Sequence, residues 1–297
     1  MTLDTIPVAL FAYRRPDLLE RCLASLRANA VPLIYAFSDG ARDAAVRDDV
    51  IAVRALLHAV DWTRIEVIAA PQNLGVGTSE LRGISHVLDR HDAAVMVEED
   101  LEFVPGTYDF LVRALRHYAD TPKAMGVTAW AHPRLTPAGQ TQPYFTGRMS
   151  SLMWGTWRRA WAGVRETNSL DLLRECAAKG VDVTRFGYDL ATPVDNDEAR
   201  GHWDRRFNLH MLARGGLFLF PATSMVRHTG YDERATNSPN GKGWEEDVRP
   251  APDPAAVRWP AVVEQPGSGD LWRREVGPPP LTFMGRVRRK LRRWLRR

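Results

Sequence analysis

Hydrophobic and polar positions in the first hundred residues follow two alternating patterns. Four short apolar runs have the length of buried strands: Val8–Ala12, Leu33–Phe37, Ile65–Ala69 and Ala93–Val97. The segments between them repeat apolar residues at helical spacing, over residues 18–26, 46–57 and 81–88. This β-α-β-α-β-α-β order predicts an α/β, Rossmann-like fold, in which helices flank both faces of a mostly parallel sheet.

Charged residues follow three of the predicted strands within two positions. Arg14 follows the first, Asp39 follows the second, and Glu98 to Asp100 follow the fourth. Ligands of open α/β sheets bind outside the carboxyl ends of the strands. We therefore expect these residues to lie together in a binding site.

The rest of the chain is less regular. Residues 110–118 and Phe207–Leu212 have helical patterns, and Leu217–Phe220 is a predicted strand. Residues 126–164 are rich in Trp, Gly and Pro, while 231–280 are rich in Pro, Gly and charge and are expected to be irregular. We predict a main domain over residues 1–236, an irregular surface wrap over 237–280, and a C-terminal helix over 281–297.

The C-terminal end differs in charge from the rest of the chain. Residues 286–297 hold eight Arg or Lys and no acid, and without these eight cations the formal net charge of +4 becomes −4. Apolar residues recur there at helical spacing: Met284, Val287, Leu291, Trp294 and Leu295. The pattern predicts a basic amphipathic helix in peripheral contact with a membrane. A disordered tail and nonspecific nucleic-acid binding are the alternatives, and the acidic body argues against a nucleic-acid partner.

Composition and cysteine content indicate a globular protein of the cytoplasm. Hydrophobic residues make up 44% and charged residues 26% of the chain, which is ordinary for a globular fold. The two cysteines, Cys22 and Cys176, cannot form a disulfide framework and suit a reducing compartment. No secretory signal is visible, and no apolar run approaches the roughly 18 residues that span a bilayer. We expect a cytoplasmic location, with the tail on the inner face of the membrane.

Three consecutive acids, Glu98-Glu99-Asp100, follow the fourth apolar run. Carboxylates at this density repel one another unless a cation or a basic ligand neutralises them. Mg²⁺ or Mn²⁺ fits, because such an ion takes one or two carboxylates and completes its shell with phosphate oxygens and water. A solvated acidic turn or helix N-terminus is the structural alternative.

The segment AAVMVEEDLEFVPGTYDFL, residues 93–111, resembles the DXD-type region of the N-acetylglucosaminyltransferase I family and of related bacterial glycosyltransferases with the GT-A fold. Five more segments resemble that family in the same chain order: PVALFAYRRPDLLERCLASL, IYAFSDG, GVTAW, SSLMWGTWRRAW and GHWDRRFNLHMLARGGLFLFP. The resemblance covers roughly residues 6–236, and in the family the middle acid is Asp where this chain has Glu99.

The resemblance implies an inverting, metal-dependent glycosyltransferase that moves a sugar from a nucleotide-sugar donor to an acceptor hydroxyl. The catalytic base falls on Asp204, with Asp195, Asp197 and Glu198 as competitors. Donor-binding roles fall on Arg14, Asp39, Arg82, Glu98, Glu99 and Arg227. Mn²⁺ or Mg²⁺ falls on Asp100, with His228 as a further ligand or a phosphate contact.

Aromatic residues around position 154 suit the apolar faces of sugars. Candidate contacts to the sugar and acceptor are Trp130, Trp154, Gly155 and Trp203. Trp157 and Trp161 lie four residues apart and are expected in the core. The acceptor would be a glycan or a lipid-linked glycan in cell-surface glycan biosynthesis, since a lipid-linked acceptor would explain the basic tail.

Two other classes of function remain open. A sugar nucleotidyltransferase shares the α/β plan but needs a Gly-rich basic loop after the first strand, whereas FAYRRPD contains no glycine. A noncatalytic protein that binds carbohydrate or nucleotide would share the site but would release no free nucleotide from any donor.

Overall fold

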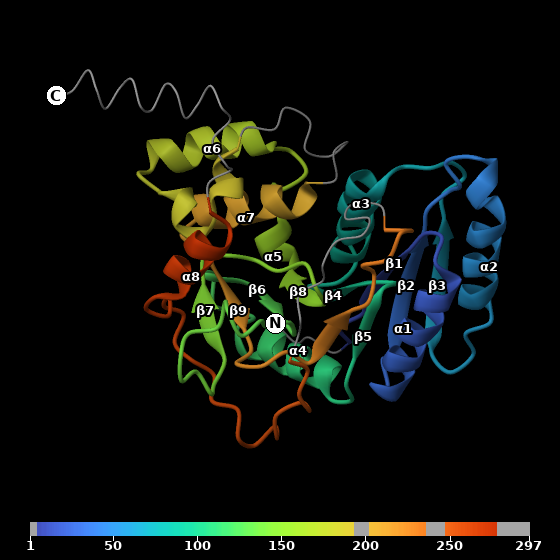
Figure 1. Cartoon of the computed structure of the whole chain (residues 1–297), viewed down its shortest axis with the longest axis horizontal. Coiled ribbons are helices and arrows are strands. Elements are labelled where there is room, and N and C mark those ends of the chain that lie inside the picture. Colours follow the sequence, from blue (N-terminus) through green and yellow to red (C-terminus); the bar gives the residue numbers. More distant parts are fainter. Residues whose placement is uncertain (1–4, 193–201, 236–246, 278–297) are drawn as a thin grey trace.

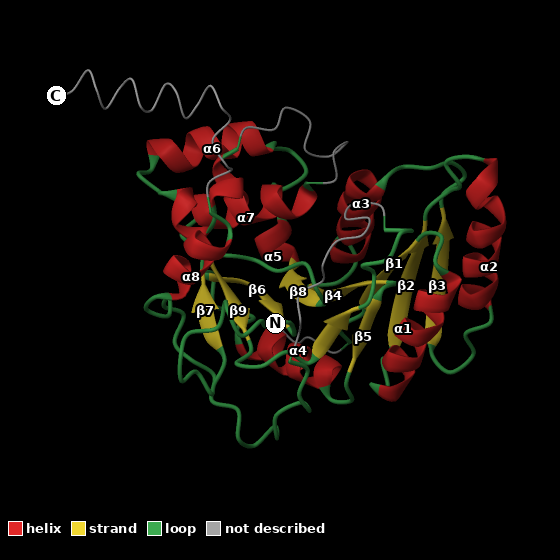
Figure 2. Cartoon of the chain, in the orientation of Figure 1, coloured by secondary structure: helices red, strands yellow, loops and turns green. Residues whose placement is uncertain are grey.

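The computed structural model describes residues 5–192, 202–235 and 247–277 (Figure 1). The predicted C-terminal helix over 281–297 lies outside these residues. The described part forms one eight-stranded sheet in the order β3-β2-β1-β4-β8-β6-β9-β7, and a separate pair, β10 (Val226–His228) with β5 (Leu101–Phe103). Helices lie on both sides of the large sheet (Figure 2).

The first half of the sheet is parallel throughout. It consists of β1 (Val8–Ala12), β2 (Leu33–Ser38), β3 (Arg64–Ala69) and β4 (Ala93–Glu98). The connecting helices are α1 (Pro16–Ala28), α2 (Arg47–His58) and α3 (Val76–Leu88). Pro16 suits the first turn of α1, where its missing N–H is no loss. The predicted Rossmann-like class, with a mostly parallel sheet flanked by helices, is confirmed.

The second half of the sheet is mixed. It consists of β6 (Ala124–Thr128), β7 (Tyr144–Thr146), β8 (Trp154–Trp157) and β9 (Leu217–Phe220). Strand β8 runs antiparallel to both β4 and β6, whereas β9 is parallel to β6. The weak periodicity of residues 126–164 did not predict β7 and β8, because strands of three and four residues are too short to show a period.

The remaining helices surround this second half. They are α4 (Thr107–His117), α5 (Arg158–Trp161), α6 (Ser169–Ala178), α7 (Trp203–Ala213) and α8 (Ser268–Glu275). Helix α8 lies in a region expected to be irregular. It is anchored by Trp272, which is buried and contacts the ring of Phe220 at 6.1 Å between centroids. In the described part of the chain, which Figure 1 draws in colour, no helix is long and apolar enough to cross a membrane.

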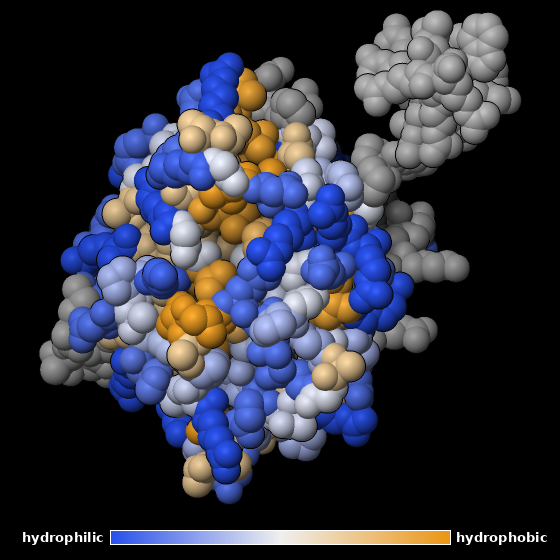
Figure 3. Space-filling model, turned by 90° about the vertical axis from the view of Figure 1, so that its left-hand side faces the viewer, coloured by the Kyte–Doolittle hydropathy of each residue, from blue (hydrophilic) through white to orange (hydrophobic). Residues whose placement is uncertain are grey.

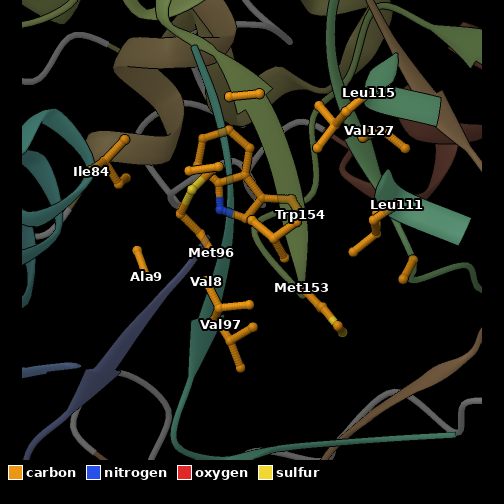
Figure 4. Close-up of a cluster of buried hydrophobic side chains, with 14 of the residues drawn as sticks. Val8, Ala9, Ile84, Met96, Val97, Leu111, Leu115, Val127, Met153 and Trp154 are labelled. Atoms are coloured by element: carbon orange, nitrogen blue, oxygen red, sulfur yellow. The ribbon is translucent and has the colours of Figure 1, made fainter. Parts of the chain in front are cut away.

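The core extends through both halves of the sheet. Figure 4 shows Trp154 of β8 at its centre, with Ile84 of α3 on one side and Leu111 and Leu115 of α4 on the other. Apolar side chains on the face drawn in Figure 3 form small areas bounded by hydrophilic ones. The large apolar side chains that are clearly exposed in the described part are Ile51 and Val263.

Candidate functional site

A cleft of about 390 Å³ lies at the carboxyl ends of β1, β2 and β4. The parallel registers align these ends, since Ala12 pairs with Ser38 and Phe11 pairs with Glu98. The loops that follow the three strands therefore face the same space. This volume falls within the usual range for small-molecule sites. Arg14, Asp39 and the acid triplet line the cleft together, as the strand order predicts.

Arg15 holds the acid triplet at the cleft wall. Its guanidinium donates to Asp100 Oδ2 at 2.6 Å and to Glu99 Oε1 at 3.1 Å. It also donates to the Gly230 carbonyl at 3.2 Å. Sequence reasoning assigned the neighbouring Arg14 and missed Arg15. The doubled arginine after β1 was the available signal, and it does not say which of the two turns toward the acids.

The short β10 strand (Val226–His228) brings the C-terminal part of the fold to the triplet. It pairs antiparallel with β5 (Leu101–Phe103), so that His228 lies opposite Leu101. His228 Nε2 lies 3.1 Å from Asp100 Oδ2. The two residues predicted to hold a metal are thus adjacent, although 128 positions separate them in the sequence.

Gly230 is required by the close approach of Arg15 and Asp100. A Cβ atom at this position would lie 2.0 Å from Asp100 Oδ2 and 2.8 Å from Arg15 Nη1. Any larger residue would displace the ion pair at the cleft wall. Sequence reasoning missed this role, because it depends on a contact between distant segments.

The carboxyls of the triplet have unequal proton affinities. Burial and the Asp100 charge raise the pKa of Glu98 to about 8, and they raise the pKa of Glu99 to about 7. Burial would also raise the pKa of Asp100, but hydrogen bonds and positive charge from His228 and Arg15 hold it below its usual range. Asp100 is therefore the member of the triplet that stays ionised most readily.

Asp100 also has an incomplete set of partners. Its Oδ1 atom is buried and has no hydrogen-bond partner among the described residues. A buried, ionised oxygen without a donor is costly unless a cation or a ligand completes it. Within the described ranges, no group of three or more His, Cys, Asp or Glu side chains is arranged to hold a metal ion.

Asp39 is satisfied by the loop that precedes α3. Its Oδ1 accepts from the backbone N–H groups of Gly40 and Leu74, both at 2.8 Å. Its Oδ2 accepts from the Asn73 side chain and the Gly75 N–H, both at 3.1 Å. Asp39 lines the cleft while it fixes this loop, so its present contacts are structural.

The other predicted donor-binding arginines differ in position. Arg14 lines the cleft and donates to the Arg234 carbonyl at 2.6 Å. Arg82 and Arg227 are exposed and do not line it. Arg227 stands next to His228 in a strand, where successive side chains point to opposite faces. The structure therefore brings Arg14, but neither Arg82 nor Arg227, to the cleft.

The predicted sugar-binding aromatic residues lie in the core. Trp154 is 1% exposed and stacks on Trp203 with 5.4 Å between ring centroids. Trp130 is also buried, at 3% exposure. A Cβ atom at Gly155 would meet Leu115 Cδ1 at 2.8 Å, so this glycine serves the packing of α4 on β8. In this conformation none of the three rings presents an open face to a sugar.

Asp204, the predicted base, lies in the first turn of α7. It is partly exposed and lines a smaller cavity of about 120 Å³ with Arg148, Asp189 and Asn208. Burial raises the pKa of its carboxyl, while the Arg148 charge acts in the opposite direction. The competing acids Asp195, Asp197 and Glu198 lie outside the described residues.

Fold and site together define a Rossmann-like α/β protein with an acidic, arginine-lined cleft at the carboxyl ends of its strands. No protein-family model matches the chain, and no curated protein matches it significantly. Among solved structures, the chain is similar to the mannosyltransferase PcManGT from Pyrobaculum calidifontis in complex with GDP-Man and Mn²⁺. The TM-score is 0.41 at 16% identity, and the match covers 54% of this chain and 49% of that one. None of these comparisons supports the N-acetylglucosaminyltransferase I family in particular.

Proposed function

We propose that this protein is a glycosyltransferase of the GT-A type, which moves a sugar from a nucleotide-sugar donor to an acceptor hydroxyl. One observation carries the proposal. A buried carboxylate, Asp100, has a free oxygen at the end of β4, inside a cleft that Arg14 and Arg15 also line. Acidic and basic side chains side by side suit a diphosphate bound with its counter-cation.

A divalent cation, Mn²⁺ or Mg²⁺, fits the residues present. Asp100 offers a free hard oxygen, and His228 lies next to it. These two residues would hold the ion, with phosphate oxygens and water completing its shell. When bound, the ion would supply neutralisation of the charge that develops on the departing diphosphate. Arg15 already lies against Asp100 and adds positive charge at the same point.

The donor would lie along the cleft wall formed by the strand ends. Arg14 and Asp39 flank the end nearest β2, where the nucleoside would bind, and Glu98 and Glu99 would contact ribose or sugar hydroxyls. Glu98 is the last residue of β4, and Glu99 follows it in the turn that leads to β5. A site fixed on strands in this way orients the donor before reaction.

Transfer with inversion needs one base to take the proton of the acceptor hydroxyl as its oxygen attacks the anomeric carbon. We assign this role to Asp204. The helix that carries it is anchored by Trp203 and Phe207, and burial raises the basicity of its carboxylate. Attack and departure of the nucleoside diphosphate would occur in a single displacement, which requires the acceptor to approach from the α7 side.

The acceptor would be a glycan or a lipid-linked glycan of the cell surface. The eight cations of residues 286–297 would hold the enzyme near an anionic membrane, where such acceptors are assembled. We place the protein in the cytoplasm, peripheral to the inner face of that membrane.

The test is release of free nucleotide. The full-length protein is incubated with Mn²⁺ and with UDP-, GDP-, dTDP- and CMP-sugars in turn, and the free nucleoside phosphate is measured. We expect one class of donor to be consumed, and excess chelator to stop its consumption. Binding of a sugar nucleotide without any release would instead identify a noncatalytic binding protein.

A further inference from the structure

Glu80 is a buried acid of the cleft that the proposed reaction does not use. It lies in the second turn of α3, lines the cleft, and is 3% exposed. It makes no hydrogen bond or ion pair with any other residue that the structure describes. Sequence reasoning gave no signal for it, because a single Glu in an amphipathic helix reads as a solvated residue.

The contrast with Asp39 shows what is unusual about Glu80. Both carboxyls line the same cleft. Asp39 accepts four hydrogen bonds, whereas Glu80 accepts none from the described residues. Removing a polar group from water without a partner is unfavourable. Such a group therefore lowers the stability of the ligand-free protein unless a ligand supplies its hydrogen bonds. Residues of binding sites commonly carry this cost in stability.

The surroundings of Glu80 place it between the two ends of the proposed reaction. Helix α3 packs on β4, which leads into the acid triplet, and on α7, which carries Asp204. Burial raises the pKa of Glu80 well above its usual range, and the charges of Glu98, Glu99, Asp100 and Asp204 raise it further. Glu80 thus lines the same cleft as the triplet, on a helix that contacts the helix of Asp204.

In a single displacement, the anomeric carbon lies between the diphosphate that leaves and the hydroxyl that attacks. The transferred sugar would thus lie between the triplet and Asp204, next to the cleft wall that Glu80 lines. We propose that Glu80 binds this sugar by hydrogen bonds to its hydroxyl groups, and so selects donors that carry a free hydroxyl at that position. This inference rests on the proposed function, and it adds the chemical class of the donor sugar.

Such a contact would discriminate strongly between donors. A site built to hydrogen-bond a substrate hydroxyl rejects an analogue that lacks it, because the polar group is then left unpaired. An apolar pocket rejects an unwanted group much less strongly. We therefore expect a polar hexose, rather than a sugar deoxygenated at the carbon facing Glu80.

The experiment compares Glu80→Ala and Glu80→Gln with the control Glu20→Gln, at an exposed position of α1. Calorimetric titrations with Mn²⁺ measure the affinities of UDP and GDP, and of UDP-glucose and GDP-mannose. For Glu80→Ala we expect nucleoside diphosphate affinity within about twofold of wild type, and sugar-nucleotide affinity weaker by about 10- to 100-fold. Glu80→Gln keeps the shape and should fall between the two.

Several results would overturn the inference. Unchanged sugar-nucleotide affinity in Glu80→Ala would do so. An equal loss for nucleoside diphosphates would assign Glu80 to the cation or the diphosphate instead. If the wild-type protein bound no sugar nucleotide at all, that result would contradict the proposed function, and with it this inference.

Thermal stability separates a ligand-binding role from a structural one, even if Glu80→Ala does not fold. Glu80→Gln removes a crowded acid, so the ligand-free variant should melt about 2 °C or more above wild type. A residue retained for packing would show the opposite shift. A lower melting temperature together with wild-type sugar-nucleotide affinity would contradict a role in sugar binding.

Discussion

The cleft at the end of β4 and the aromatic core beneath β8 lie on adjacent strands, yet they are built in opposite ways. In the cleft, Asp100 Oδ1 and the Glu80 carboxyl lack partners among the described groups. In the core, Trp154 contacts the rings of Trp203 and Phe207 at 5.4 and 5.3 Å between centroids. One region keeps polar groups ready for a ligand, and the other supplies the packing that holds them in place.

Helix α7 belongs to both regions. Trp203 and Phe207 are buried on the aromatic core, while Asp204 between them is partly exposed at the start of the helix. The packing of the two rings therefore fixes where Asp204 lies relative to the cleft. If the division between the regions is correct, substitutions in the cleft change chemistry and substitutions in the core change stability.

The largest expected effect is on turnover in Asp204→Asn. The amide keeps the size of the side chain but cannot accept the acceptor's proton, and a general base contributes about 10²- to 10⁴-fold. Donor affinity should barely change, because the lost interaction belongs to the transition state. Steady-state kinetics and donor titration measure the two quantities.

Asp48→Asn is the matched control, since Asp48 lies in the first turn of α2 and is exposed. It should leave turnover unchanged. Near-wild-type turnover in Asp204→Asn would place the base elsewhere, with Asp195, Asp197 and Glu198 next. Loss of donor binding together with turnover would move Asp204 into the donor site.

Trp154→Ala should have the largest effect on stability. Removing a fully buried Trp from the core leaves a cavity and costs about 3–5 kcal/mol. Urea unfolding measures the loss, and Trp62→Ala, at a partly exposed position, should cost less. If Trp154→Ala kept wild-type stability but lost sugar binding, Trp154 would be a sugar contact, as its sequence pattern predicts.

The pH dependence of stability should reveal the crowded acids of the cleft. The pKa values of about 8 for Glu98 and about 7 for Glu99 lie above those of an unfolded Glu, so the folded state binds these protons more tightly. Stability is then lost as pH rises from the unfolded toward the folded value. Each such carboxyl contributes about 1.4 kcal/mol per pH unit at most.

Melting curves of the ligand-free protein from pH 5.5 to 8.5 would test this expectation. We expect the melting temperature to fall across the range, and the slope to flatten in Glu98→Gln. A melting temperature that rises with pH would mean that the triplet is already neutralised by its neighbours. In that case the acids of the cleft would have partners, and the cleft would differ less from the packed aromatic core than we propose.

The smallest expected effect on chemistry comes from the tail, which belongs to neither region. Truncation after Gly277 removes all eight cations of residues 286–297. Sedimentation with anionic vesicles should be abolished, because each basic residue contributes about 1 kcal/mol near such a surface. Turnover on a soluble acceptor analogue should stay nearly intact. Equal vesicle binding by both forms would exclude a membrane-binding tail.

The sequence predicted the cleft better than the core. Periodic apolar residues locate β1 to β4 and α1 to α3, and strand order alone brings Arg14, Asp39 and the triplet to one edge. No local pattern decides whether Trp154 faces a ligand or the core. Its partners Trp203 and Phe207 lie about 50 residues further along and reach it only after folding.

Contacts between distant segments also explain what sequence reasoning missed at the site. Arg15 donates to the triplet and to the Gly230 carbonyl, whereas Arg14 donates to the Arg234 carbonyl. Arg82 and Arg227 carry suitable chemistry, but they are exposed and do not line the cleft. Residue type can thus nominate a ligand contact, whereas its direction depends on packing that a single sequence does not show.

The central claim is that the free oxygen of Asp100 completes a cation-dependent nucleotide site. Calorimetric titration of UDP and GDP into wild type and Asp100→Ala, each with Mn²⁺ and with excess chelator, tests it directly. We predict that wild type binds one nucleotide only with Mn²⁺, and that Asp100→Ala loses this binding while its circular dichroism spectrum is unchanged. Equal nucleotide affinity in the two proteins, or full wild-type affinity in excess chelator, would contradict the account.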